Sequence, residues 1–126
     1  PVIAFAGDGD FLMNGQEIAT AKQYGLNVVF IVVNNGMYGT IRMHQEREYP
    51  GRISATRLIN PDFAAYARAF GCHGEVVDRT ADFASAFERA RDADGPALIE
   101  LRIDAEAITP ATSLSAIRSA AKKRQT

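Results

Sequence analysis

The sequence has no tryptophan, a single cysteine and no large excess of charge of either sign. Its 126 residues include 14 basic and 15 acidic side chains, which gives a formal net charge of −1. Without a basic excess the chain has little to attract a phosphate backbone, so we expect no nucleic-acid partner. The lone Cys72 excludes an internal disulfide framework and a multi-cysteine metal site, and it is typical of the reducing cytoplasmic compartment.

Long hydrophobic runs are also missing. The longest, Val28–Val33, has the length of a strand, whereas a membrane-spanning helix needs about 20 apolar residues. We therefore expect no membrane partner. The first residues lack the basic leader and the cleavage site of a signal peptide, and they look like a strand already under way at Pro1. We therefore expect the chain to be part of something longer.

Apolar runs alternate with helix-like segments along the whole chain. We expect buried strands over residues 2–6 and 28–33, and further strands over 75–77 and 97–103. Helices are expected between these runs, over residues 14–24, 38–46, 60–70 and 82–90, and in a C-terminal tail over 111–126. This alternation predicts an α/β fold: a parallel sheet with helices on both faces, joined by right-handed crossovers.

Local patterns also predict where two of these helices begin and which residues share one side of another. Asn14 followed by Glu17 matches a capping box, so the first helix is expected to begin there. Ile41 and Met43 are expected on one side of the second helix. Asn60 precedes Pro61 and is expected to cap the third helix. Residues 47–58, rich in arginine and turn formers, are expected to form an irregular surface loop.

Polar clusters follow the first two expected strands. Gly7-Asp8-Gly9-Asp10 comes after the first and Asn34-Asn35-Gly36 after the second. Ligands of open parallel sheets bind beyond the carboxyl ends of the strands, so we expect Asp8 and Asn35 to lie close together, although 27 positions separate them. A carboxylate and an amide oxygen suit Mg²⁺, while exposed N–H groups and a helix N-terminus suit an anion. The pattern predicts a metal-bridged diphosphate site.

Two other interpretations of these clusters are weaker. A dinucleotide-binding fingerprint needs a third glycine five positions after Gly7, where the chain has Leu12. A plain strand-to-helix turn favours Gly, Asp and Asn and would explain either cluster alone. It does not explain why both clusters fall at one edge of the same sheet.

The spacing of the clusters resembles a known signature. Gly7-Asp8-Gly9, followed after 24 residues by Asn34-Asn35, is similar to the thiamine diphosphate motif of the acetolactate synthase and pyruvate decarboxylase superfamily. The likeness continues through residues 14–18, 24–26, 60–63 and 95–100, and it is strongest to acetolactate synthase. It implies the thiamine diphosphate-binding fold, truncated at its N-terminus. Residues 1–126 would then be part of the diphosphate-binding (PP) domain of a larger multidomain enzyme.

The resemblance also implies roles for particular residues. Mg²⁺ would be bound by the side chains of Asp8 and Asn35 and by the backbone carbonyl of Met37. The substrate side of the cofactor would be lined by Thr40, Ile41 and His44. The acid that activates the cofactor would come from a pyrimidine-binding domain of a partner subunit, so no catalytic residue is assigned within this chain. The remaining cofactor contacts would come from the backbone of both clusters, at Gly7, Gly9, Asp10, Gly36 and Tyr38.

The activity implied is decarboxylation of a 2-keto acid and its ligation to a second carbonyl compound, in a homodimer or homotetramer, with the fragment alone inactive. Ile41 stands where pyruvate decarboxylases carry a glutamate, which argues against a simple decarboxylase. His44 stands where acetolactate synthases carry a tryptophan, which leaves the acceptor open. The alternatives are a 2-keto acid decarboxylase or aldehyde lyase of the same superfamily, and a non-catalytic scaffold that keeps the fold.

Overall fold

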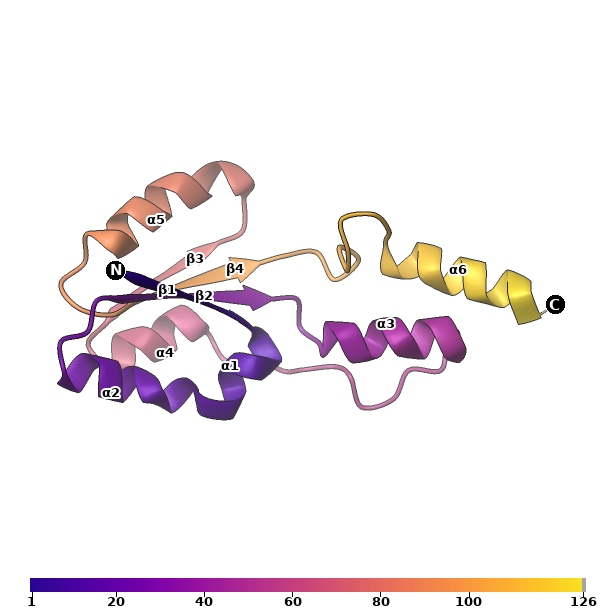
Figure 1. Ribbon diagram of the computed structural model, residues 1–126, viewed down its shortest axis with the longest axis horizontal. Helices are drawn as coiled ribbons and strands as arrows, with labels where there is room; N and C mark the ends of the chain where they lie inside the picture. Colours follow the sequence, from indigo (N-terminus) through magenta and orange to yellow (C-terminus); the bar gives the residue numbers. More distant parts are fainter. Residues whose placement is uncertain (126) are drawn as a thin grey trace. The chain divides into compact units, whose positions relative to one another are not determined.

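The computed structural model describes residues 1–125, and the chain divides into two compact units (Figure 1). Unit 1 comprises Pro1–Asn34 and Asn60–Arg102. Unit 2 comprises Asn35–Ile59 and the chain from Ile103 onward. Unit 1 carries the sheet and the helices that cover it, and unit 2 carries two helices and the loops that join them.

Unit 1 is built on a sheet of four parallel strands in the order β1-β2-β4-β3. The strands are β1 (Val2–Gly7), β2 (Val28–Asn34), β3 (His73–Val77) and β4 (Ala97–Arg102). In the register of the first pair, Gly7 lies beside Val33, so β1 and β2 end at the same edge of the sheet. The predicted α/β class and the four strand positions are confirmed.

Helices cover both faces of this sheet, as predicted (Figure 1). One face carries α1 (Asp8–Asn14), α2 (Ile18–Gln23) and α4 (Phe63–Ala69), with the short 3-10 turn Gly15–Glu17 between the first two. The other face carries α5 (Phe83–Arg91), which follows the 3-10 turn Thr80–Asp82.

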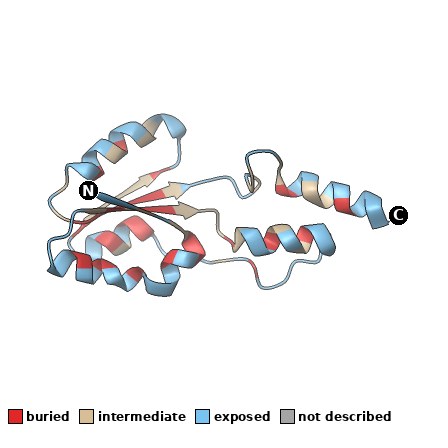
Figure 2. Cartoon of the chain, viewed as in Figure 1, coloured by how far each residue is buried: buried red, intermediate tan, exposed pale blue. Residues whose placement is uncertain are grey.

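Two apolar clusters, one on each face, hold unit 1 together. The first packs α1, α2 and α4 against β2 and β4, with the rings of Phe11 and Phe63 in an edge-to-face contact at 5.6 Å between centroids. The second packs Ala86 and Ala90 of α5 against β2, β3 and β4. The buried residues therefore gather in the sheet and on the sheet-facing sides of the helices (Figure 2).

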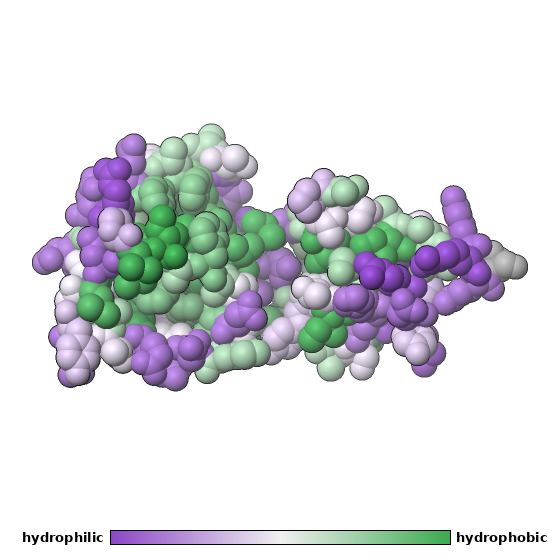
Figure 3. Space-filling view, in the orientation of Figure 1, coloured by the Kyte–Doolittle hydropathy of each residue, from purple (hydrophilic) through white to green (hydrophobic). Residues whose placement is uncertain are grey.

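Strand β1 is not buried, contrary to the expectation for its apolar run. Among residues 1–125 it is an edge strand with a neighbour on one side only, and Phe5 remains 70% exposed. Ile3 and Phe5 lie beside Val29 and Ile31, which form part of the cluster under α5, but α5 packs over β3 and β4. The apolar side chains of β1 therefore contribute to the hydrophobic surface that is visible in Figure 3.

The first helix begins earlier than the capping-box pattern predicts. Helix α1 starts at Asp8, directly after β1, and Asn14 makes no side-chain capping bond. Gly7 is the N-cap, and its N–H donates to the Asp10 carboxylate at 3.2 Å. Two acidic residues in the first turn favour a helix start because they face the positive end of its dipole. The Gly-Asp-Gly-Asp run is thus a helix start and not a loop.

Helix ends follow the glycines, whereas one predicted N-cap is wrong. After α2, Gly25 has φ +60° and its N–H donates to the Lys22 carbonyl, as in a Schellman motif. Helix α4 is capped by Asp62, whose carboxylate accepts the N–H of Ala65 at 2.7 Å. Asn60 does not cap this helix, because its amide is engaged with two other side chains.

Unit 2 contains α3 (Gly39–Glu48) and α6 (Leu114–Gln125), which pack against each other. The buried side of α3 carries Arg42 and Glu46, while Ile41 is 55% exposed. The buried side of α3 is occupied by the Arg42–Glu46 ion pair and not by apolar side chains. The 47–58 segment is irregular after α3 ends, as predicted, although Thr56 within it is buried.

Glu46 is the electrostatic centre of unit 2. Its side chain is 1% exposed and accepts hydrogen bonds from Arg118 Nε of α6 at 2.8 Å, from Arg42 Nε at 3.0 Å and from the N–H of Gly51 at 2.8 Å. These donors, with Arg118 first, outweigh the opposing effect of burial and lower the pKa of Glu46 from 4.5 to about 2.

Replacing Glu46 by Gln should therefore destabilise the protein in a pH-dependent way. A pKa lowered in the folded state stabilises the fold above the unfolded pKa, and this stabilisation is lost as the pH falls from 4.5 toward about 2. We expect Glu46→Gln to cost about 3 kcal/mol at neutral pH and distinctly less near pH 3, measured by chemical denaturation. The exposed Glu48→Gln on the same helix is the control. A pH-independent difference would contradict this account.

Candidate functional site at the carboxyl edge of the sheet

Asp8 lies just beyond β1, at the first position of α1, and its side chain is buried. It is 3% exposed. One carboxylate oxygen accepts the N–H of Gly9 at 3.0 Å, and the other accepts the side-chain amide of Asn60 at 2.7 Å. These two donors are neutral groups, and they help to fix the orientation of the carboxylate.

A chain of side-chain hydrogen bonds leads from Asp8 across the sheet. The Asn60 Nδ2 that reaches Asp8 also donates to Asn34 Oδ1 at 2.8 Å, and Asn34 Nδ2 donates to Glu100 Oε1 at 2.9 Å. Asn34 ends β2 and Glu100 lies in β4. These hydrogen bonds thus connect side chains along the carboxyl edge of unit 1, from the end of β1 to β4. We call this series of hydrogen bonds the Asp8–Glu100 relay.

Two members of this relay were not predicted from the sequence as site residues. Asn60 was predicted only as a helix cap, and Glu100 was given no role. Glu100 did carry a signal, because it is a charged residue inside an apolar strand, and buried charges in proteins are almost always paired. Asn60 carried no comparable signal, since an Asn before a Pro is common at helix starts.

In unit 2, Asn35 is held by a local turn. Its Oδ1 accepts the N–H of Met37 at 3.1 Å, and Gly36 between them has φ +70°, which a residue with a side chain rarely adopts. A Cβ on Gly39 would lie 2.8 Å from Asn35 Nδ2 and 2.9 Å from the Cδ1 of Ile108. The absence of a side chain at residue 39 therefore leaves the room that the Asn35 amide occupies.

The segment after Asn35 pairs with the 47–58 loop. The N–H of Tyr38 donates to the carbonyl of Thr56 at 2.9 Å, and the N–H of Leu58 donates to the carbonyl of Gly36 at 2.9 Å. The Tyr38 N–H is thus used within unit 2, so a cofactor contact there would need another atom of that residue. The carbonyl of Met37 takes part in neither bond.

The expected substrate-side residues lie along α3. Thr40, Ile41 and His44 are all exposed, whereas the buried positions of the helix are Arg42 and Glu46. Asp8 belongs to unit 1 and Asn35 to unit 2. The pairing of these two residues around one ion, and the joint pocket with α3, stay predictions.

The donor set fits a hard cation better than a transition metal. Among residues 1–125, no group of three or more His, Cys, Asp or Glu side chains is placed to hold a metal. The ligand set predicted from the sequence is one carboxylate (Asp8), one amide oxygen (Asn35) and one backbone carbonyl (Met37). Such an all-oxygen set, with few charged ligands, is typical of Mg²⁺ that is shared with a substrate or cofactor phosphate.

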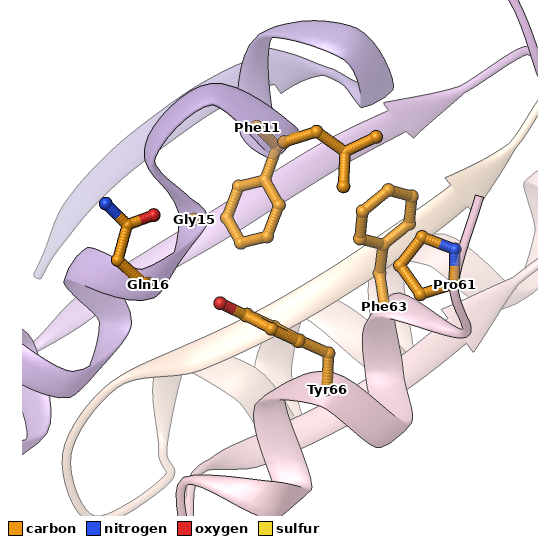
Figure 4. Close-up of a pocket in the computed structure, with 7 residues that line it drawn as sticks. Phe11, Gly15, Gln16, Pro61, Phe63 and Tyr66 are labelled. Carbon is orange, nitrogen blue, oxygen red and sulfur yellow. The ribbon is translucent and has the colours of Figure 1, made fainter. Parts of the chain in front are cut away.

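A cavity lies near this edge but is not large enough for a cofactor. Phe11, Phe63 and Tyr66 point into a space of about 60 Å³ beside Pro61, with Gln16 at its rim (Figure 4). Binding pockets for cofactor-sized molecules usually exceed about 300 Å³. This cavity is a gap between α1 and α4 in the first apolar cluster.

Among the described residues, no helix is long and apolar enough to span a membrane.

Comparisons with known proteins point to one family. Residues 1–101 match the model of the thiamine pyrophosphate enzyme C-terminal TPP binding domain. Acetolactate synthase isozyme 2 large subunit of Escherichia coli is 36% identical over 104 residues, 82% of this chain and 19% of that protein. Acetolactate synthase large subunit of Parasynechococcus marenigrum is 46% identical over 81 residues, 62% of this chain and 13% of that protein.

A solved structure agrees with the sequence comparisons. The crystal structure of benzoylformate decarboxylase from Polynucleobacter necessarius superposes with a TM-score of 0.77 and 27% identity, covering 84% of this chain and 20% of that one. The chain therefore spans about a fifth of the length of the first of these relatives and of this structure.

Because Gly39 lies close to the Asn35 amide, a substitution at residue 39 tests directly how Asn35 is placed. We expect Gly39→Ala to displace the Asn35 amide, because the new methyl group would overlap its nitrogen. In NMR spectra, the side-chain amide resonances of Asn35 and the N–H resonance of Met37 should shift. Thr40→Ala, at the neighbouring exposed position, should leave both in place. Unchanged Asn35 resonances in folded Gly39→Ala would contradict this account.

Proposed function

The chain belongs to the thiamine pyrophosphate enzyme family, within the C-terminal TPP-binding domain of acetolactate synthase-like enzymes, and from this membership we propose that it binds thiamine diphosphate through Mg²⁺. The proposed ligands of the ion are the Asp8 carboxylate, the Asn35 amide oxygen and the Met37 carbonyl. The observation that supports this most is the buried Asp8 carboxylate, held by neutral N–H donors at the carboxyl edge of a parallel sheet.

The backbone around the two glycine-flanked clusters would hold the diphosphate. Gly7, Gly9 and Asp10 surround the first turn of α1, where the helix dipole favours an anion, and Gly36 and Tyr38 lie in the turn after Asn35. Glycine lets a ligand approach the backbone closely. An ion between the Asp8 carboxylate and the diphosphate would remove the repulsion between two negative groups.

When bound, the thiazolium ring of the cofactor accepts the electron pair released as a 2-keto acid loses carbon dioxide. The contribution of this chain would be to orient and bind. The Mg²⁺ ligands anchor the diphosphate, and Thr40, Ile41 and His44 offer exposed side chains for the substrate. Ile41 offers an apolar side chain, whereas His44 offers an imidazole that can form hydrogen bonds.

We propose a carboligase of the acetolactate synthase type, which joins a 2-keto acid such as pyruvate to a second carbonyl compound. The two relatives carry that name, and the chain spans about a fifth of the first of them. The activating glutamate would lie in a pyrimidine-binding domain of a partner subunit, so the complete site would need a homodimer or homotetramer. We propose that this chain alone is inactive and that the assembly works in the cytoplasm.

A second candidate is a 2-keto acid decarboxylase or aldehyde lyase of the same superfamily. It is favoured by the likeness to benzoylformate decarboxylase and by His44, which replaces the tryptophan expected in acetolactate synthases. A non-catalytic scaffold that keeps the fold is a third candidate. A scaffold would have no need for the Asp8 and Asn35 pair, so their presence favours an enzyme.

Calorimetric titration tests the binding proposal. We expect thiamine diphosphate to bind only when Mg²⁺ is present, and Asp8→Ala to lose at least about tenfold in affinity, since about 1.4 kcal/mol corresponds to a factor of ten. Asp94→Ala, an exposed aspartate in the turn before β4, is the matched control and should bind as the unmodified protein does. Binding that needs no divalent ion, or that Asp8→Ala leaves unchanged, would contradict the proposal.

Product analysis tests the activity proposal. The 126-residue chain supplied with thiamine diphosphate, Mg²⁺ and pyruvate should release no acetolactate, because the activating acid is expected on another domain. Acetolactate formed by this chain alone would overturn the proposed division of the site between subunits.

A further inference from the structure

We propose that Asn60 and Glu100 are positioning residues that hold the Asp8 carboxylate in one orientation for the cation. The inference rests on the proposed function for the identity of the ion. For its geometry it rests on unit 1 alone, where all members of the Asp8–Glu100 relay lie.

The carboxylates at the two ends of the relay dictate the orientation of both amides between them. A carboxylate only accepts hydrogen bonds, so Asn60 must present its Nδ2 to Asp8, at 2.7 Å. The same nitrogen lies 2.8 Å from Asn34, which must therefore present its Oδ1. The Nδ2 of Asn34 is then directed to Glu100, at 2.9 Å, which again only accepts. Reversing either amide would set like groups against each other.

Glu100 is the fixed end of the relay. Its side chain is 1% exposed, and besides Asn34 it accepts the N–H of Phe63 at 3.2 Å and the Nε of Arg102 at 2.9 Å. Phe63 is the first residue of α4 and Arg102 is the last residue of β4. A buried carboxylate needs such donors, and they fix its position in turn. The orientation of Asp8 is thus tied to β4 and to the start of α4.

Asn60 gives up a hydrogen bond to hold this arrangement. Its Oδ1 is buried and, among the described residues, it has no hydrogen-bond donor. Buried polar atoms are normally satisfied, and leaving one unsatisfied lowers stability. Rotating the amide to seek a donor for Oδ1 would bring that oxygen against the Asp8 carboxylate. The unsatisfied atom therefore indicates that Asn60 serves the orientation of Asp8 more than the stability of the fold.

Orientation matters because Mg²⁺ demands near-ideal octahedral geometry from its ligands. Groups that hydrogen-bond to a metal ligand and orient it typically change metal affinity by about 10- to 100-fold. Asn60 donates directly to Asp8, and Glu100 acts on Asp8 through three hydrogen bonds. Removing either should weaken Mg²⁺ binding although neither residue is proposed to touch the ion.

The first test needs no metal. Glu100→Gln keeps the shape of the side chain but offers an amide in place of an acceptor-only group. We expect the side-chain amide resonances of both Asn34 and Asn60 to shift in NMR spectra, while those of the exposed Asn27 stay in place. If the Asn60 resonances do not move in the folded variant, the relay is overturned, whatever the protein binds.

The second test measures Mg²⁺ affinity at saturating thiamine diphosphate, by calorimetry, for Asn60→Ala, Glu100→Gln and the double variant. We expect each single change to weaken Mg²⁺ binding by about tenfold, and the double variant to be little weaker than the singles, because the residues act through one chain of bonds. Asn27→Ala is the matched control, and thermal unfolding without Mg²⁺ verifies that each variant is folded.

The outcomes separate this inference from the proposed function. Mg²⁺-dependent cofactor binding by the unmodified protein, with the same Mg²⁺ affinity in the folded variants, would overturn the positioning role alone. Losses that simply add in the double variant would overturn the relay as a unit. An unmodified protein that binds no cofactor would overturn the proposed function, and with it the positioning role for a cation, although the metal-free spectra would still report on the hydrogen-bond chain.

Discussion

Two buried carboxylates constrain the carboxyl edge of the sheet in unit 1. Asp8 directly follows β1 and Glu100 lies in β4, and both side chains are almost fully buried. Each can only accept hydrogen bonds, so the groups between them must donate in a consistent direction. Asn60 and Asn34 fulfil this condition and connect the two. The carboxyl edge is therefore held by hydrogen bonds between polar side chains, while the apolar clusters on either face hold the sheet itself.

Unit 2 is organised by a comparable constraint. Glu46 is buried between two arginines and a backbone N–H, and these contacts connect α3 to α6 and to the loop at Gly51. They also explain why α3 exposes Ile41. At the start of the same helix, Gly39 leaves the space that the Asn35 amide occupies. The turn that holds Asn35 thus directly precedes the helix that carries the expected substrate-side residues, and an ion-pair cluster holds that helix against α6.

The fold could be predicted from the sequence where the pattern is local. Apolar runs marked the four strands, and glycines with positive φ, such as Gly25 and Gly71, marked where helices end. The exposure of β1 was not predictable, because an apolar run does not show that its strand lies at the edge. In the site, Asp8 and Asn35 stand out because they follow strands. The role of Asn60 depends on partners 52 and 26 positions away, which no local pattern displays.

The central claim is that side-chain and backbone oxygens of Asp8, Asn35 and Met37 bind one Mg²⁺ ion that carries the diphosphate of the cofactor. A crystal structure of the protein grown with thiamine diphosphate and Mg²⁺ tests this most directly. The account predicts a single ion bound by these three oxygens and by diphosphate oxygens, with Asn60 still donating to Asp8. An ion bound elsewhere, or a diphosphate held without an ion that both Asp8 and Asn35 ligate, would contradict it.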